Sequence, residues 1–463
     1  MSRPGGAGTI PAPPPVTRES LARMDGGRTT REHWKILLVT GMGFFTDAYD
    51  LFIVGIVASM IATEWHTVSY QISLLSSLAL LTSAFGAVVF GKIADRFGRR
   101  KIYGYEMLLL AAGAIASAFA PSIWWLIGVR AVLGFGIGGD YPVSATIMSE
   151  HACRRDRGRM VALVFSMQAA GLIAGPLIAI VLLASGLSHD HAWRIMLALG
   201  AVPALAVFRL RRRMSETPRF QLAQAEAGPG AGTAPAGVTG LRGVLADRRL
   251  LRWLTGASLA WLMFDFVYYG NTISSRLVVR LAVPHGGLIG TTACTLAIFV
   301  VAALPGYLLA AVTIDRIGRR RMQAMGFAVM AAAFAGLWLL PGATTTLVPF
   351  LLLYGLSYFF AEFGPNTTTF VYPAEIFPVR VRATCHGIAA AAGKIGAFAG
   401  TYALTSLLPA IGLARTSALV AGVAVLGLLI TVTLLPEPSG VSLEELAGGP
   451  APQASGAGRR AGR

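Results

Sequence analysis

The chain has 463 residues, of which 55% are hydrophobic and only 13% are charged, and its mean hydropathy is +0.63. Soluble domains carry roughly 25% charged residues, so this composition excludes an ordinary soluble protein and indicates one that lies in a lipid bilayer. A net charge of +17 would suit a nucleic acid, but the Lys and Arg residues lie in short stretches between apolar runs. That distribution is typical of a membrane protein and argues against a nucleic-acid partner.

Apolar runs that match the thickness of a bilayer recur along the whole chain. A helix needs about 20 such residues to cross the hydrocarbon core. The runs lie near 35–60, 70–93, 102–120, 123–149, 159–185, 193–209, 252–274, 289–312, 322–341, 345–373, 383–409 and 414–435. We therefore predict an all-α membrane protein with twelve transmembrane helices in two six-helix bundles.

The two sets of six runs are separated by a polar segment. An Arg211-Arg212-Arg213 run and a Gly/Ala/Pro-rich stretch at 227–238 predict an exposed linker there. The predicted regions are a disordered cytoplasmic N-terminus at 1–33, an N-terminal bundle at 34–209, a cytoplasmic linker at 210–251, a C-terminal bundle at 252–435 and a cytoplasmic tail at 436–463. The first 31 residues show no cleavable signal pattern, so the first apolar run is expected to act as the insertion signal.

Basic residues in alternate loops predict the orientation. The loops at 92–101, 153–159 and 316–321 are rich in Lys and Arg, whereas the alternate loops hold none. Only the arginines at 276, 280 and 415 depart from this pattern. By the positive-inside rule both termini and the linker are cytoplasmic, which requires an even number of helices.

The two halves also repeat in sequence. The motif DRFGRR at 95–100 returns as DRIGRR at 315–320, each time after the second helix of its half. An acidic residue followed seven positions later by an arginine also occurs after each fourth helix, as Glu150 with Arg157 and Glu375 with Arg382. Such repeats are typical of secondary transporters, which rock one half against the other around a central site.

Several motifs resemble those of the major facilitator superfamily. They are GKIADRFGRR at 91–100, the segment at 130–139 and a weaker second copy at 311–320. SETPRF at 215–220 and PEPSGVSLEE at 436–445 are similar to the ends of sugar-porter-type halves. The resemblance covers nearly the whole chain and implies the major facilitator fold.

Three further segments resemble the phosphate:proton symporter family. They read GFFTDAYDLF at 43–52, GGDYPVSATIMSE at 138–150, and FGPNTTTF at 363–370 followed by CHGIAAAAGK at 385–394. Trp261, Asp265 and Tyr269 also fall where that family places a Trp, an Asp and a Tyr. The departures, a Thr for the usual Ser in the motif at 215–220 and Pro438 for a Thr, concern loop ends.

Ionisable residues inside apolar runs are costly in a bilayer and point to function. Asp47 and Asp50 lie three positions apart and share a helix face, and Trp261, Asp265 and Tyr269 do so at spacings of four. Carboxylates in a poorly solvated cavity hold protons and can carry them across. The alternative is that the two acids in the first helix only bind neighbouring helices through hydrogen bonds.

Lys394 is the only lysine that lies away from a predicted membrane edge. It suits an anionic substrate, although a salt bridge with Asp265 or Asp140 that merely joins the halves would also explain it. The neutral side chains that can donate hydrogen bonds to an oxyanion are Tyr141, Gln168, Trp261, Tyr269 and Asn366, each of which can equally be an ordinary polar membrane residue.

The resemblance to the symporter family implies roles for particular residues. Its substrate-binding positions correspond to Tyr141, Gln168, Trp261, Asp265, Tyr269, Asn366 and Lys394. Its proton path corresponds to Asp47, Asp50, Asp140 and Asp265.

A separate set of charges is predicted near the cytoplasmic helix ends. This gating set is Asp95, Arg130, Glu150, Arg157, Glu375 and Arg382. Paired acids and bases there would latch the halves in an outward-open state. The alternative, a group of solvated loop charges, explains the arginines but not the repeated Glu-to-Arg spacing.

We predict a secondary active transporter that takes up inorganic phosphate with protons by alternating access. Neither a catalytic motif, a nucleotide loop nor a metal-ligand spacing appears in the sequence, so no enzyme activity, cofactor or metal is expected. The alternatives are a symporter of a sugar, polyol or organic acid, and a nutrient receptor that does not transport. The expected setting is a monomer spanning the cell inner membrane.

Overall fold

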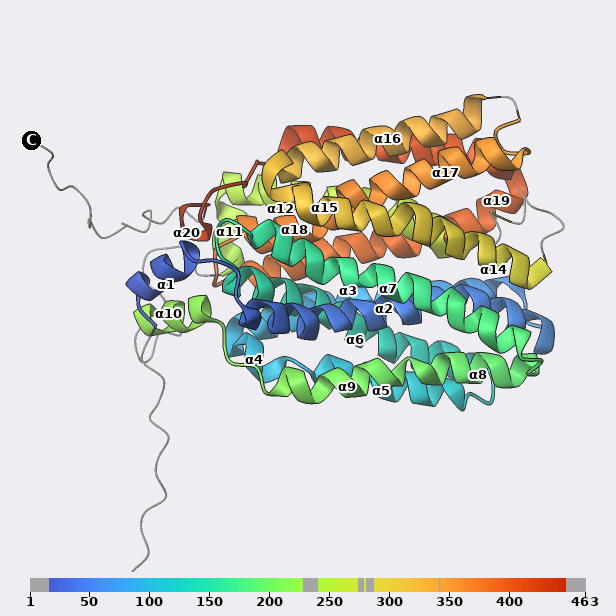
Figure 1. Cartoon of the computed structure of the whole chain (residues 1–463), viewed down its shortest axis with the longest axis horizontal. Helices are drawn as coiled ribbons and strands as arrows, with labels where there is room; N and C mark the ends of the chain where they lie inside the picture. The colour runs from blue at the N-terminus through green and yellow to red at the C-terminus, as the bar shows by residue number, and fades with distance from the viewer. Residues whose placement is uncertain (1–15, 228–239, 274–278, 280–286, 341, 447–463) are drawn as a thin grey trace, which may run out of the picture.

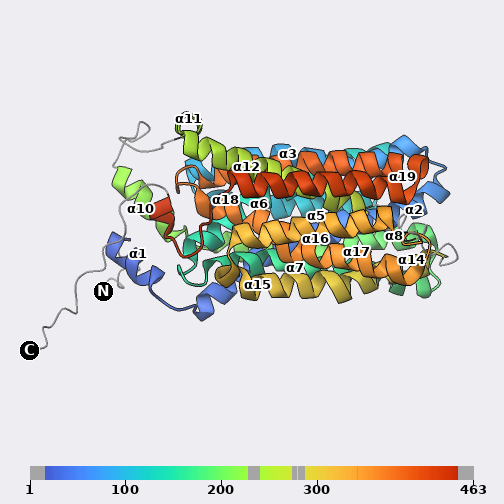
Figure 2. The same cartoon turned by 90° about the horizontal axis from the view of Figure 1, so that it is seen from above.

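The computed structural model describes residues 16–227, 240–273, 279, 287–340 and 342–446, and these contain helices but no strands. The long helices run side by side along one axis, as Figures 1 and 2 show from two directions. Among the described residues, ten helices are long and apolar enough to cross a membrane. The prediction of an all-α membrane protein is confirmed.

The first half of the chain contains the helices of the first six predicted runs. They are α2 (Arg31–Glu64), α3 (Ser69–Phe97), α4 (Arg99–Ile102), α5 (Tyr105–Ala118), α6 (Ile123–His151), α7 (Arg157–Ala184), α8 (His189–Leu199) and α9 (Ala201–Arg212). The third run gives only the 14 residues of α5, preceded by the short α4.

The second half is more interrupted than its hydropathy suggests. Its elements are α12 (Arg248–Ile273), α14 (Gly287–Ile298), η1 (Phe299–Ala303), α15 (Leu304–Ile317), α16 (Arg319–Leu339), α17 (Leu347–Ala361), η2 (Glu362–Asn366), α18 (Thr367–Ile376) and α19 (Arg382–Leu434). The last two predicted runs both lie within α19, which consists of two helices that meet at the non-helical Gly412. With φ +78, Gly412 adopts a conformation that residues with a side chain rarely reach.

Small residues let the central helices approach closely. A Cβ on Gly138 of α6 would lie 1.9 Å from the Ser83 carbonyl oxygen of α3. In the second half a Cβ on Gly400 of α19 would lie 2.0 Å from the Phe266 carbonyl oxygen of α12. Such small-residue contacts are the usual means of packing helices within a membrane. Meanwhile large apolar side chains such as Val301 and Leu352 face outward, at 75% and 68% exposed.

Helices α3 and α7 of the first half make the main contacts with the second half. Helix α3 packs against α19, and α7 packs against α14 and α15. A Cβ on Gly387 of α19 would lie 2.3 Å from the Ala87 carbonyl oxygen of α3, so these backbones nearly touch. The substrate residues predicted from both halves are thereby brought to one central interface.

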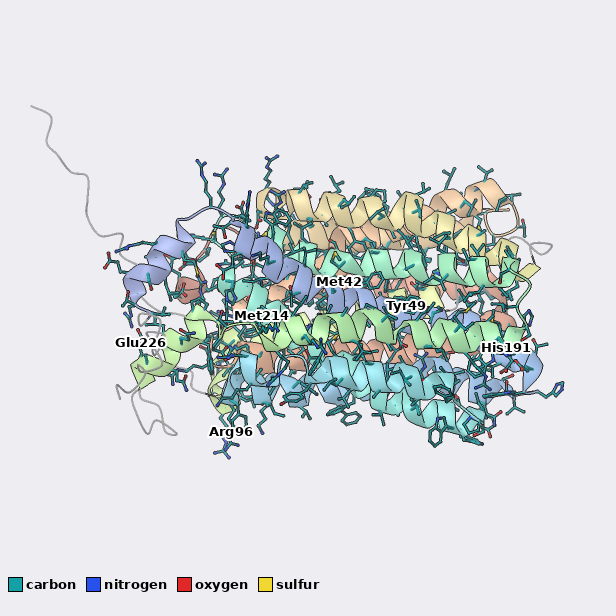
Figure 3. All side chains as sticks on the ribbon, turned by 60° about the horizontal axis from the view of Figure 1, so that its bottom comes forward. Met42, Tyr49, Arg96, His191, Met214 and Glu226 are labelled. Carbon is teal, nitrogen blue, oxygen red and sulfur yellow. The ribbon has the colours of Figure 1, made fainter. Side chains whose placement is uncertain are left out.

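Four short helices gather at one end of the bundle (Figure 1). They are α1 (Arg18–Asp25), α10 (Pro218–Ala227), α11 (Leu241–Ala246) and α20 (Leu443–Leu446). Figure 3 places Arg96 and Glu226 at this end and His191 at the other. The described parts of both terminal segments and of the linker thus lie at the same end, as an even number of crossings requires.

The prediction of disorder throughout 1–33 is wrong for α1. Thr17 caps this helix through the Ser20 backbone N–H, and Asp25 at its other end accepts a hydrogen bond from Arg219 of α10 at 2.5 Å. Arg219 also donates to Glu444 of α20 at 2.9 Å. Burial raises the pKa of Glu444, but the Arg219 guanidinium, the hydrogen bonds to this carboxylate and the charge of Arg382 together hold the pKa below its usual value. The predicted disordered stretches at 1–15, 228–239 and 447–463 lie outside the described residues.

Candidate functional site

Lys394 of α19 lies at the centre of a buried polar cluster. Its Nζ donates hydrogen bonds to the Tyr269 hydroxyl at 2.9 Å and the Tyr141 hydroxyl at 3.1 Å. The Asp265 carboxylate lies 3.4 Å away, which identifies the acid that sequence alone left open between Asp265 and Asp140. Lys394, Asp265 and Tyr141 are each 1% exposed. Tyr141 comes from α6 in the first half, so the cluster spans both halves.

Aromatic rings complete this cluster. The Nζ of Lys394 lies 4.3 Å from the ring centroids of both Tyr141 and Tyr269, within the range of a cation–π interaction. Trp261 packs 6.1 Å from Tyr141, centroid to centroid, and a Cβ on Gly393 would lie only 2.4 Å from its ring. Because Gly393 has no side chain, the Trp261 ring can pack next to it, beside Lys394.

Gln168 and Asn366 lie in a second cluster. Both contact Tyr307 of α15, whose hydroxyl donates to Gln168 Oε1 at 2.6 Å and accepts from Asn366 Nδ2 at 2.7 Å. The ring of Phe165 stands between the clusters, 6.2 Å from Tyr141 and 6.3 Å from Tyr307. Within the described residues no hydrogen bond joins the two clusters directly. Of the seven predicted substrate residues, five lie in the cluster around Lys394, and Gln168 and Asn366 lie in the second cluster.

The second cluster depends on a break between α17 and α18. Gly364 has non-helical dihedral angles (φ −106, ψ −107) and Pro365 follows it, so the segment forms the π-helical turn η2. Such turns often occur at functional sites. This one presents Asn366 and Glu362 to the same interior, and Asn366 Nδ2 donates to Glu362 Oε2. Glu362 and Tyr307 were not among the site residues predicted from the sequence. Glu362 could have been found, because an acidic residue inside the apolar run at 345–373 points to function.

The two acids of α2 differ in their surroundings. Asp50 forms an ion pair with Arg130 of α6 at 2.5 Å. Asp47, fully buried one turn earlier, has no hydrogen-bond partner for either carboxylate oxygen among the described residues. The prediction that Arg130 lies with the cytoplasmic gating set is wrong. Arg130 lies near the start of α6, and its guanidinium forms an ion pair with Asp50.

Asp140 lies in a third charged group with Arg211 of α9. Arg211 donates to both Asp140 oxygens, at 2.6 and 3.1 Å, and to Glu106 of α5 at 2.8 Å. The Ser144 hydroxyl donates to Asp140 as well. Arg211 was predicted to lie in an exposed linker, and this is wrong, since its side chain is 0% exposed. The last turn of α9 faces inward and its guanidinium reaches back into the bundle.

Gly43 provides a test of that group. Its Cβ would lie 1.8 Å from Asp140 Oδ2 and 2.1 Å from Arg211 Nη2, so Gly43→Ala should displace the ion pair and destabilise the fold by about 1–3 kcal/mol. Gly128→Ala is the matched control, because nothing lies within 4 Å of that position and alanine there should stabilise the helix by roughly 0.5–1 kcal/mol. Thermal unfolding in detergent measures both, and an unchanged midpoint for Gly43→Ala would contradict this geometry.

The remaining gating residues form two crossed bridges between the halves. Glu150 of the first half pairs with Arg382 of the second at 3.0 Å, and Glu375 pairs with Arg157 at 3.3 Å. Each glutamate also pairs with an arginine of its own half, Arg99 for Glu150 and Arg319 for Glu375, at 3.0 and 2.8 Å. The sequence repeat pointed to these four residues as Glu150 with Arg157 and Glu375 with Arg382, but each arginine bonds to the acid of the other half.

The repeated aspartates hold helix N-termini across the interface. Asp95 accepts from the backbone N–H groups of Ala383 and Thr384 at the start of α19, at 3.3 and 2.6 Å. Asp315 accepts from Gly158 and Arg159 at the start of α7, at 3.2 and 2.8 Å. A carboxylate at a helix N-terminus is stabilised by unpaired N–H groups and the helix dipole. These contacts close the interface at the end that bears α1, α10 and α20.

Comparison with known proteins places this geometry among transporters. The family described as Major Facilitator Superfamily matches residues 40–401. "Inorganic phosphate transporter 1-6" of Oryza sativa subsp. japonica is 35% identical, over 93% of this chain and 95% of that protein. "Probable inorganic phosphate transporter 1-6" of Arabidopsis thaliana is 32% identical, over 94% and 97%. Among solved structures, the proton:xylose symporter XylE bound to 6-bromo-6-deoxy-D-glucose has a TM-score of 0.76 at 19% identity, covering 90% of this chain and 98% of that one.

Proposed function

The chain belongs to the Major Facilitator Superfamily and, within it, to the family of the inorganic phosphate transporters, and on this premise we propose that it takes up inorganic phosphate together with protons. It is a multi-pass membrane protein and a secondary active transporter. The observation that carries the proposal is Lys394, a fully buried cation bonded to hydroxyls from both halves and to one carboxylate.

Charge balance at Lys394 couples the anion to a proton. With Asp265 ionised, the charge of Lys394 is already compensated, so a phosphate anion would add an uncompensated negative charge to a buried site. Protonation of Asp265 frees the ammonium group for phosphate. The hydroxyls of Tyr141 and Tyr269, already within hydrogen-bond distance of Nζ, supply further donors.

The crossed salt bridges control the opening of the cytoplasmic end, which alternating access requires. They hold the cytoplasmic ends of the halves together, so release of phosphate inward requires the pairs of Glu150 and Glu375 to separate. Neutralisation of the site by phosphate plus proton lets the halves close around it and then reopen on the other side. The empty, charged site resists that closure.

Transport assays in proteoliposomes test the function. Radiolabelled phosphate should accumulate under an inward proton gradient, and a protonophore should abolish the accumulation. Arsenate should compete, whereas sugars, polyols and organic acids should not. Accumulation driven only by a sodium gradient, or competition by a sugar, would overturn the proposal.

The setting of the transporter follows from its charges. We place it in the cell inner membrane as a monomer, with α1, α10 and α20 in the cytoplasm, because the basic loops belong to that end. The bundles are proposed at 34–209 and 252–435, joined by the linker at 210–251. Accessibility of a cysteine introduced in the linker to an impermeant maleimide tests the orientation.

Asp47 is the proton-path residue whose replacement should separate coupling from binding. Asp47→Asn removes no hydrogen bond or ion pair of the described structure. Proton-driven accumulation should therefore fall at least about tenfold, while phosphate exchange at equal pH changes less than roughly twofold. Asp50→Asn is the contrast, because it leaves Arg130 buried without its partner and should lower the thermal midpoint. Full accumulation by Asp47→Asn would remove this residue from the proton path.

A further inference from the structure

Glu362 is a buried acid that the mechanism above does not use. It opens η2 in the middle of the span Leu347–Ile376, and it is 0% exposed. One carboxylate oxygen accepts from Asn366, and the other has no hydrogen-bond partner among the described residues. A carboxylate that has no cation beside it is costly at such a depth, so its presence calls for a function.

Cations accompany most other buried acids of the described bundle. Six of them pair with Lys or Arg: Asp50, Glu106, Asp140, Glu150, Asp265 and Glu375. In the described structure Glu362 pairs with no Lys or Arg, and the same is true of Asp47 in the other half. A buried carboxyl group without a cation is stable only when it carries a proton.

The groups that face Glu362 are hydroxyls. Tyr268 of α12, Tyr307 of α15 and Tyr358 of α17 are its titratable neighbours. Helices α16 and α18 also pack against η2, but among their described residues none places a charged group at this carboxyl. A change in the charge of Glu362 is therefore not masked by a nearby ion.

Asn366 connects Glu362 to the proposed substrate site. Its side-chain amide donates to Glu362 Oε2 and to the Tyr307 hydroxyl, so both of its N–H groups are occupied. Tyr307 in turn donates to Gln168, whose own Nε2 has no partner among the described residues. An ionised Glu362 holds the Asn366 amide more strongly than a protonated one. Protonation therefore releases an N–H group for an incoming anion.

Polar groups also lead from Glu362 toward the end of the bundle opposite α1 and α10. A small pocket between α12, α16 and α17 is lined by Tyr268, Asn271, Ser357 and Tyr358 together with four apolar side chains. The Tyr268 hydroxyl has no hydrogen-bond partner within the described residues, and Tyr358 donates to Thr272 at 3.0 Å. Helix α17 begins at that far end (Figure 1), so the pocket lies on the side from which protons would enter.

We propose that Glu362 is a further proton-carrying group of the transporter, besides Asp265 and Asp47, which binds a proton from the outer side and thereby frees Asn366 for the anion. The inference rests on the proposed function and deepens it. A proton from water forms an O–H bond at Glu362 Oε1 and returns to water on the cytoplasmic side, so no other reactant is needed. By reciprocity, bound anion favours the protonated carboxyl to the same extent.

Glu362→Gln in the full-length protein tests the inference, because glutamine mimics the protonated acid. Phosphate exchange at equal pH should stay within about twofold, while the coupling ratio from reversal potentials should fall by about one proton per phosphate. Glu226→Gln, on exposed α10, is the matched control and should keep the wild-type ratio. A wild-type ratio in Glu362→Gln would overturn the proposal.

Infrared spectroscopy provides a readout that does not depend on transport. The wild type should show a protonated-carboxyl band that Glu362→Gln removes and Glu362→Asp shifts. If Glu362→Gln fails to fold, the shift in Glu362→Asp still assigns the band, and a band unchanged by Asp would overturn the inference. Failure of the wild type to accumulate phosphate would sink the proposed function, yet the spectrum would still decide whether Glu362 holds a proton.

Discussion

Lys394→Ala is expected to abolish concentrative phosphate uptake and to weaken phosphate binding by roughly a hundredfold. Removal of one partner from a buried, hydrogen-bonded charge pair costs about 3 kcal/mol, which corresponds to that factor. The variant loses the only cation in contact with the hydroxyls of Tyr141 and Tyr269 in the described site. Binding of radiolabelled phosphate to purified protein, alongside uptake in proteoliposomes, measures both effects.

Two further variants separate binding from folding. Lys394→Ala alone leaves Asp265 buried and unpaired, so its thermal midpoint should fall. The double variant with Asp265→Asn removes both charges and should regain stability without regaining phosphate binding. Lys92→Ala, exposed at the end of α3, is the control for loss of a lysine and should bind as the wild type does. Normal binding by the double variant would show that Lys394 is only a structural link.

The fold could be predicted from the sequence because its main signals are local. The length of an apolar run and the charge of the next loop are read without knowing which helices touch. What hydropathy does not reveal is continuity along the backbone. The runs at 383–409 and 414–435 are two helices that meet at Gly412, as their separation in sequence predicts, whereas 345–373 is broken at Gly364. Both features depend on single glycines within apolar sequence.

The site could be predicted only where residue spacing determines a shared face or a repeat. Asp265 and Tyr269 are four apart on α12 and both reach Lys394. Arg130 and Arg211 were misplaced because a long guanidinium side chain joins a partner far from its own backbone. Glu362 was missed although it directly precedes the FGPN segment used for the family resemblance, since that segment begins one residue later.

Glu150→Gln combined with Glu375→Gln is expected to open the cytoplasmic end. Each glutamate pairs with two arginines. Among the described residues, the double variant leaves Arg157 and Arg382 buried without a carboxylate partner, while Arg99 and Arg319 keep only Asp95 and Asp315. Breaking a buried pair costs about 3–5 kcal/mol, enough to shift a two-state equilibrium by at least roughly a hundredfold. The closed state should lose this stabilisation, because the crossed pairs exist only while the halves touch.

Cys385 reports that opening. It is 0% exposed and directly follows Thr384, whose N–H donates to Asp95 across the interface. In a background with Cys153→Ser and Cys294→Ser, an impermeant maleimide applied from the cytoplasmic side should label Cys385 much faster in the double variant. Glu226→Gln, an exposed glutamate at the same end, should leave the rate unchanged. Equal labelling rates in the double variant and the wild type would mean that the crossed bridges do not hold the halves closed, and that the helix N-termini bound by Asp95 and Asp315 suffice.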